Sequence, residues 1–188
     1  MADTKVNPNK TKSIRELGMV DIEKLKQLIT SLSETVWEKE TKNRENDFEC
    51  FHHTQHIIFR FPNQLTDRRI VHDNPIWNVW KPFLLPILEK AVEPYDYENG
   101  QIKAVMLARL KAGYGIDKHI DGSMSYYFLH KIHIPIQTND KALFYIEPDT
   151  YHLKEGIAYE VNNIVPHAVE NLGDEDRIHL IFEYMETK

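Results

Sequence analysis

IKAVMLARL at residues 102–110 and IHLIFEY at residues 178–184 are the first and last of five short apolar segments in the C-terminal half of the chain. Turn signals rich in Gly, Asn or Asp separate most of these segments, which is typical of successive β-strands. The three segments between them are YYFLHKIHIPI (126–136), ALFYI (142–146) and GIAYEV (156–161). Such a run of short strands predicts a double-sheet jelly roll or a barrel.

The N-terminal half has the periodicity of helices instead. Apolar residues recur at helical spacing from Asp21 to about Glu40, and Asp21 can cap this helix. A second helical stretch runs from about Ile76 to Val92 and contains two prolines, so we expect a kink in it. Helices followed by strands predict the α+β class, here a double-stranded β-helix (a cupin-like jelly roll) with the N-terminal helices packed on the sheet.

The length of 188 residues fits a single domain. Residues 1–13 are polar, and we interpret them as a flexible tail. Residues 14–188 are then expected to form one domain, with a helical part at 14–98 and a β-rich core at 99–188.

Composition and charge exclude several classes of protein. The chain is 41% hydrophobic and 28% charged, which is ordinary for a globular domain. Its formal net charge of −6 argues against the concentrated basic face that nucleic-acid binding needs. A single cysteine permits no internal disulfide and suits a reducing compartment. Because signal-peptide and membrane-helix patterns are both absent from the sequence, we expect a cytoplasmic protein with no membrane partner.

A metal-binding pattern lies in the strand-rich half. His119 and Asp121 form an HxD motif, and two side chains at this spacing point to the same face of an extended segment. His167 lies in an apolar, strand-like run, where a polar ring needs a buried partner or a metal, and it is the best candidate for a third ligand. Two imidazoles and one carboxylate leave coordination positions open, which suits non-haem Fe(II). The alternative interpretation is a surface pair at 119 and 121 with a satisfied core histidine at 167.

Arg177 follows His167 at the start of the last strand-like segment. Its planar guanidinium pairs bidentately with carboxylates and stays charged at any working pH. It could therefore bind the far end of a dianionic co-substrate that chelates iron with its near end. His179, on the same face, could orient a ligand or be a core histidine.

The stretch from Leu107 to Tyr184 resembles the aspartyl/asparaginyl β-hydroxylase family of 2-oxoglutarate oxygenases, which also includes free-proline hydroxylases. The resemblance implies a double-stranded β-helix with Fe(II) held by the three candidate ligands. The segments that carry it are LARLKAGYGIDKHID (107–121), KIHIPI (131–136), YHLKEG (151–156), VNNIVPHAVEN (161–171) and RIHL (177–180).

The resemblance also implies a reaction. Such enzymes use O2 to convert 2-oxoglutarate to succinate and CO2 while they hydroxylate an unactivated C–H bond, here one of an amino acid, free or in a peptide. It implies that Arg177 binds the distal carboxylate of 2-oxoglutarate, and that Lys131 and His133 lie near the other end. The family usually has Arg at the position of Lys131, and a lysine cannot form the same bidentate contact. Animal members lack the carboxylate ligand, so Asp121 is more like the smaller microbial members.

Other residues are weaker candidates for substrate contacts. Arg109 lies on the strand before the HxD motif, where it either faces the metal and binds a substrate carboxylate or forms an ion pair. Tyr127 is expected at the mouth of the site, and the histidines of the HHxxH cluster at 52–56 are expected to be solvated or substrate-facing. Two other functions remain open: a cupin-type metalloenzyme that does not use 2-oxoglutarate, and a catalytically silent jelly-roll binding module.

Overall fold

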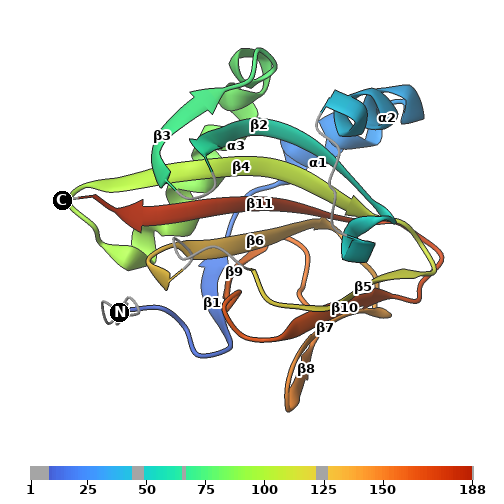
Figure 1. Ribbon diagram of the computed structural model, residues 1–188. Helices are drawn as coiled ribbons and strands as arrows, with labels where there is room; N and C mark the ends of the chain where they lie inside the picture. Colours follow the sequence, from blue (N-terminus) through green and yellow to red (C-terminus); the bar gives the residue numbers. More distant parts are fainter. Residues whose placement is uncertain (1–8, 44–48, 65–66, 122–126, 188) are drawn as a thin grey trace.

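The computed structural model describes residues 9–43, 49–64, 67–121 and 127–187. Their elements form two antiparallel sheets and three helices of more than one turn (Figure 1). The helices and 3-10 turns are α1 (Glu23–Thr30), α2 (Glu34–Asn43), η1 (Glu49–Phe51), α3 (Trp77–Val92) and η2 (Glu93–Tyr95). The strands are β1 (Ile14–Met19), β2 (Thr54–Gln64), β3 (Asp67–Asp73), β4 (Gly100–Leu110), β5 (Tyr114–His119), β6 (His130–Gln137), β7 (Ala142–Ile146), β8 (Asp149–Tyr151), β9 (Ile157–Val161), β10 (His167–Asn171) and β11 (Arg177–Glu186).

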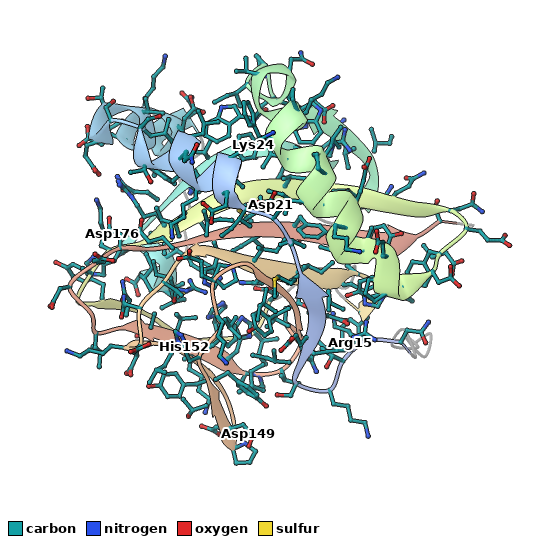
Figure 2. All side chains as sticks on the ribbon, turned by 180° about the vertical axis from the view of Figure 1, so that it is seen from behind. Arg15, Asp21, Lys24, Asp149, His152 and Asp176 are labelled. Carbon is teal, nitrogen blue, oxygen red and sulfur yellow. The ribbon has the colours of Figure 1, made fainter. Side chains whose placement is uncertain are left out.

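The two sheets differ in size. The large sheet has the strand order β1-β9-β6-β11-β4-β2-β3, and the small sheet has the order β5-β10-β7-β8. Each pairing between these strands is antiparallel, as in a jelly roll. The small sheet lies against one face of the large sheet, and Figure 2 shows α1 and α3 across the opposite face.

Period-two alternation divides the large sheet between two environments. On β4, Val105 and Leu107 belong to the core that the sheet forms with the helices, whereas Met106 and Ala108 face the small sheet and line a cavity. The same division holds on β11, where Leu180 joins the helix-side core. A second, smaller core fills the space between the sheets with Leu110, Phe144, Ile146, Leu153, Tyr159, Val161 and Val169.

The N-terminal region departs from the sequence-based expectation. The single helix expected over 21–40 is two helices, because the chain turns at Ser31, whose hydroxyl and N–H both donate to the Leu28 carbonyl. Serine competes with the helix in this way by bonding to nearby backbone. Asp21 accepts a hydrogen bond from the Glu23 N–H at 3.1 Å, so it satisfies one of the free amides at the helix start. The α3 helix continues through both of its prolines.

The segment interpreted as a flexible tail is also different. Residues 1–8 lie outside the described residues, but Lys10 is buried, and the chain after it enters the large sheet as β1. β1 pairs with β9 from Ile14 opposite Val161 to Met19 opposite Ile157. No strand was predicted at residues 14–19. Among the described residues, no helix is long and apolar enough to cross a membrane.

The packing of α3 on the sheet leads to a stability prediction. Leu84 is fully buried in the helix-side core, whereas Val79 on the same helix is 68% exposed. We expect Leu84→Ala to lower the free energy of unfolding by about 2–5 kcal/mol, because it removes apolar contacts and leaves a cavity. Val79→Ala should change it by less than about 0.5 kcal/mol. Urea unfolding followed by circular dichroism measures both, and equal effects of the two substitutions would contradict this packing.

Candidate metal and co-substrate site

The small sheet brings two of the three candidate ligands together. β5 ends at His119 and β10 begins at His167, and the two residues are direct partners across the antiparallel pair. Asp121 lies two residues beyond the end of β5, and its N–H donates to the Asn163 carbonyl at 3.0 Å. As a result, one potential ligand atom from each of the three side chains lies within 4.8 Å of the others. This geometry fits a single divalent ion.

Backbone hydrogen bonds set the tautomer of both histidines. The Nδ1 of His119 is 2.7 Å from the Asp117 carbonyl, and the Nδ1 of His167 is 2.9 Å from the Val165 carbonyl. A carbonyl only accepts, so each Nδ1 carries a proton, and in the neutral ring the lone pair is then on Nε2. Burial lowers the pKa of His167 to about 4, which keeps this ring neutral. Both rings are thus prepared to bind a metal through Nε2.

Among the described residues, the Asp121 carboxylate accepts side-chain hydrogen bonds through one oxygen only. Its Oδ2 accepts hydrogen bonds from Lys131 Nζ at 2.5 Å and from Asn163 Nδ2 at 2.9 Å. Its Oδ1 lies 3.9 Å from the Nε2 of His119. Burial raises the pKa of Asp121, but the charge of Lys131 and these hydrogen bonds outweigh it and hold the pKa well below its usual range. The group is therefore an ionised carboxylate with one oxygen available to a metal.

Arg177 is the buried cation of the site. It begins β11, only 5% of it is exposed, and burial lowers its pKa to about 9, so it remains charged at neutral pH. Its Nη2 donates to the Nδ1 of His179 at 2.9 Å, and no carboxylate within the described ranges pairs with it. A buried charge without a counter-ion is strongly unfavourable. Such an arrangement is typical of a site for an anion.

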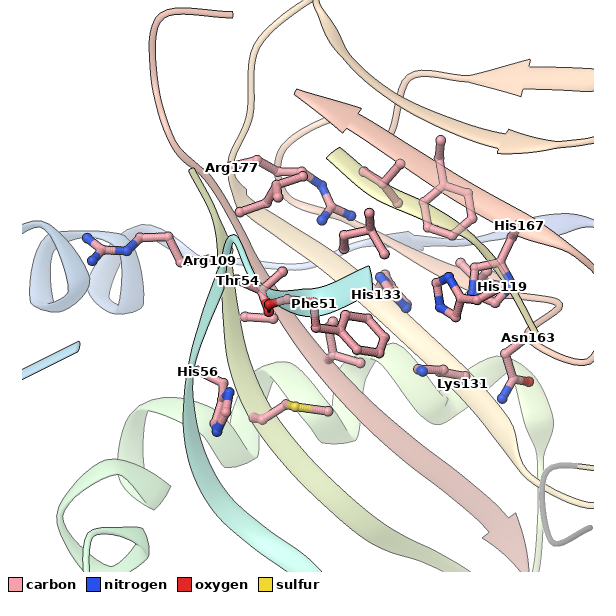
Figure 3. Close-up of a pocket in the computed structure, with 18 of the residues that line it drawn as sticks. Phe51, Thr54, His56, Arg109, His119, Lys131, His133, Asn163, His167 and Arg177 are labelled. Carbon is pink, nitrogen blue, oxygen red and sulfur yellow. Dashed lines mark hydrogen bonds between the residues drawn. The ribbon is translucent and has the colours of Figure 1, made fainter. Parts of the chain in front are cut away.

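A cavity of about 130 Å³ connects the two histidines of the triad with Arg177 (Figure 3). His133, on β6, lies between them, and burial together with the charges of Lys131 and Arg177 holds its pKa far below the usual value. The rest of the wall is mostly apolar and includes Met106, Ile116, Phe144, Val169 and Ile181. No carboxylate is among the described residues that line the cavity, which is thus a neutral to cationic space with a mostly apolar wall.

Arg109 does not face this cavity with its charged group. Figure 3 shows this group turned away from the cavity. The guanidinium donates to Glu34 on α2, with one contact at 3.0 Å, and lies 4.5 Å over the Trp37 ring. On β4, odd-numbered residues such as Leu107 point to the helices. Of the two interpretations weighed for Arg109, the ion pair is the one that the structure contains.

The remaining candidates lie in several places. Tyr127 is half-buried and is not among the described residues that line the cavity. Of the HHxxH cluster, His52 and His53 are exposed, and His53 stacks on Tyr114 with ring centroids 3.8 Å apart. His56 lines the cavity at the end away from the triad (Figure 3).

Sequence reasoning did not identify two residues that touch the ligands. Asn163 is fully buried and binds Asp121 through both its side chain and its backbone. Phe51 packs edge-on against the His119 ring, with centroids 5.1 Å apart. Asn163 follows an apolar strand and precedes His167 by a few residues, which is the one signal in the sequence that could have indicated it.

Comparisons with known proteins place this geometry in a family. The sequence model for aspartyl/asparaginyl β-hydroxylases matches residues 80–187. No curated protein matches the chain significantly.

Two solved structures show the shared fold. HygX from Streptomyces hygroscopicus, with nickel and 2-oxoglutarate bound, is 13% identical with a TM-score of 0.58, over 94% of this chain and 84% of that one. The viral collagen prolyl hydroxylase of Paramecium Bursaria Chlorella virus-1 is 11% identical with a TM-score of 0.53, over 94% of this chain and 97% of that one. The family match spans more than half of the sequence and contains the triad and Arg177, and the chain belongs to the aspartyl/asparaginyl β-hydroxylase family.

Proposed function

We propose that this protein is an Fe(II)- and 2-oxoglutarate-dependent hydroxylase. His119, Asp121 and His167 hold the iron, and Arg177 binds the distal carboxylate of 2-oxoglutarate. The observation that carries the proposal is a buried arginine without a carboxylate partner in the described residues, across a small cavity from three converged ligands. A cupin-type enzyme that does not use 2-oxoglutarate would have no use for this charge.

The donor set fits iron. Two neutral imidazoles and one carboxylate are the ligands of non-haem Fe(II) oxygenases, and they leave positions for a chelating co-substrate and dioxygen. Iron and 2-oxoglutarate, when bound, supply the oxidation of a C–H bond with O2, and the products include succinate and CO2. The chain itself supplies binding, orientation and a dry environment.

The residues around the triad have distinct tasks in this proposal. Arg177 offers two parallel N–H donors to a carboxylate, and the bond to His179 fixes the orientation of its guanidinium. Lys131 keeps Asp121 ionised and turns its free oxygen toward the metal. His133 remains neutral beside the co-substrate, where it can donate or accept a hydrogen bond. The apolar wall, with Phe144 and Val169, excludes water from the reacting atoms.

For the substrate, we propose an amino acid, free or as a residue of a peptide. The family name supports this class, and one structural neighbour is a collagen prolyl hydroxylase. Another neighbour, HygX, has been solved with hygromycin B bound, so the same fold also accommodates other small molecules. The cavity wall around Met106 and Ile181 is apolar, which favours an uncharged C–H group at the reacting position.

The role of Arg177 can be tested against a matched arginine. We expect Arg177→Gln to weaken 2-oxoglutarate binding by roughly 30-fold or more, because truncation of a buried charge pair costs about 2 kcal/mol or more. Arg109→Gln removes a second buried arginine that points to α2, and it should leave 2-oxoglutarate affinity unchanged. Isothermal titration of the metal-loaded protein with 2-oxoglutarate measures both. Unchanged binding in Arg177→Gln would remove the main support for the co-substrate.

The role of the triad has its own test. We expect wild-type protein to form succinate from 2-oxoglutarate in the presence of Fe(II), ascorbate and oxygen, and to do so faster with the correct amino-acid substrate. His167→Ala should abolish succinate formation and reduce metal binding, because it removes one of three ligands. His53→Ala, at an exposed histidine outside the cavity, is the control and should behave as wild type. No succinate from wild-type protein with any amino acid or peptide would favour the silent binding module.

A further inference from the structure

The N-terminal arm, residues 10–13, is bound to the chain just before the β10 ligand. The Asn162 N–H donates to the Ser13 carbonyl at 2.8 Å, and the Asn162 side chain donates to the Lys12 carbonyl at 3.0 Å. The arm continues into β1, so it is held at both its start and its end. It therefore lies against the segment that carries Asn163, the residue that binds Asp121.

Lys10 enters the interior from this arm. Only 9% of it is exposed, which is rare for a lysine. Its Nζ donates to the Leu129 carbonyl at 2.6 Å and to the Asn163 Oδ1 at 2.8 Å. Burial lowers the pKa of Lys10 to about 8, and Glu160 opposes this shift, so the side chain is still a cation at neutral pH. An ammonium group has donors only, so each of its partners must be a hydrogen-bond acceptor.

Both hydrogen bonds of the Asn163 side chain require the same orientation of its amide group. Because Lys10 can only donate, it takes the amide oxygen of Asn163, and the amide NH2 is turned to the Asp121 carboxylate at 2.9 Å. The carboxylate can only accept, so the amide has one satisfactory orientation. Hydrogen bonds in such a buried chain polarise one another, which strengthens the last bond to Asp121.

We infer that Lys10 is a positioning residue for the metal: through Asn163 it fixes the Asp121 carboxylate, so that the N-terminal arm completes the iron site. The inference rests on the proposed function, in which Asp121 is an iron ligand. It assigns a task to a buried lysine far from the ligands in sequence. A lysine that only stabilised the fold would affect unfolding but not the affinity for metal.

Co(II) titration of the metal-free protein tests this inference, with the d–d absorption of bound Co(II) as the readout. Lys10→Met keeps the length of the side chain but removes the donor and the charge. We expect its Co(II) dissociation constant to rise about 10- to 100-fold, the usual effect of removing a group that orients a ligand. Lys12→Met is the matched control, since Lys12 is an exposed lysine of the same arm, and its dissociation constant should not change.

The route through Asn163 is tested by a double-mutant cycle. If Lys10 acts through Asn163, then Lys10→Met should add little to the effect of Asn163→Ala on Co(II) affinity. Full additivity of the two effects would overturn the inference, and so would Lys10→Met with wild-type affinity and only a lower melting temperature. If circular dichroism shows Lys10→Met to be unfolded, Lys10→Gln takes its place, and wild-type Co(II) affinity there overturns the inference. Wild-type protein that binds no Co(II) would overturn the proposed function itself.

Discussion

The antiparallel pairing of β5 with β10 is the constraint on which the site depends. It sets His119 directly opposite His167, although the two are far apart in the sequence. Because β5 ends at His119, the chain beyond it is not held in the sheet, and Asp121 can turn back toward the two histidines. Backbone carbonyls next to each histidine fix the ring tautomers, so the same strands that bring the ligands together also orient them. A shift of one residue in this register would turn one imidazole to the other face of the sheet, because side chains alternate with a period of two.

The large sheet supplies the rest of the site by the same alternation. On one face of the large sheet, residues of β4 and β11 such as Leu107 and Leu180 are buried against the helices, and this packing anchors the sheet. The other face is turned to the small sheet, and Arg177 lies on it. The helical layer therefore contributes to function indirectly, since it holds the strand that presents the buried guanidinium. Arg109, which lies on the same face as Leu107, binds α2 instead.

These observations explain which features the sequence predicted. The HxD motif could be identified from its spacing, His167 from its apolar, strand-like context, and Arg177 from its place at the start of the last strand-like segment. The family resemblance fixed their order. The direction in which Arg109 points could not be derived from the sequence. Met106 and Leu107 are adjacent and both apolar, so both faces of this strand are predicted to be buried. Lys10 and β1 were missed for a different reason: their partners, Asn163 and the β9 strand, lie at the other end of the chain, and a lysine in a polar segment resembles a solvated one. The break between α1 and α2 occurs at Ser31, whose side chain bonds to the backbone. The spacing of apolar residues contains no information about such a bond.

The charge of the site also differs from that of the whole molecule. The chain carries a net charge of −6, yet the charged groups buried around the cavity include Arg177 and Lys131, and Lys131 is already paired with Asp121. Attraction for an anion is therefore created locally, by one buried guanidinium that pairs with no carboxylate of the described residues, and not by the field of the protein as a whole. Only a bound carboxylate would offset the unfavourable burial of that charge. The protein should therefore be more stable against unfolding with the anion bound than without it. Under the proposed function, a dicarboxylate would be selected over a monocarboxylate, since only a ligand with acceptors at both ends can bind the metal and Arg177 together.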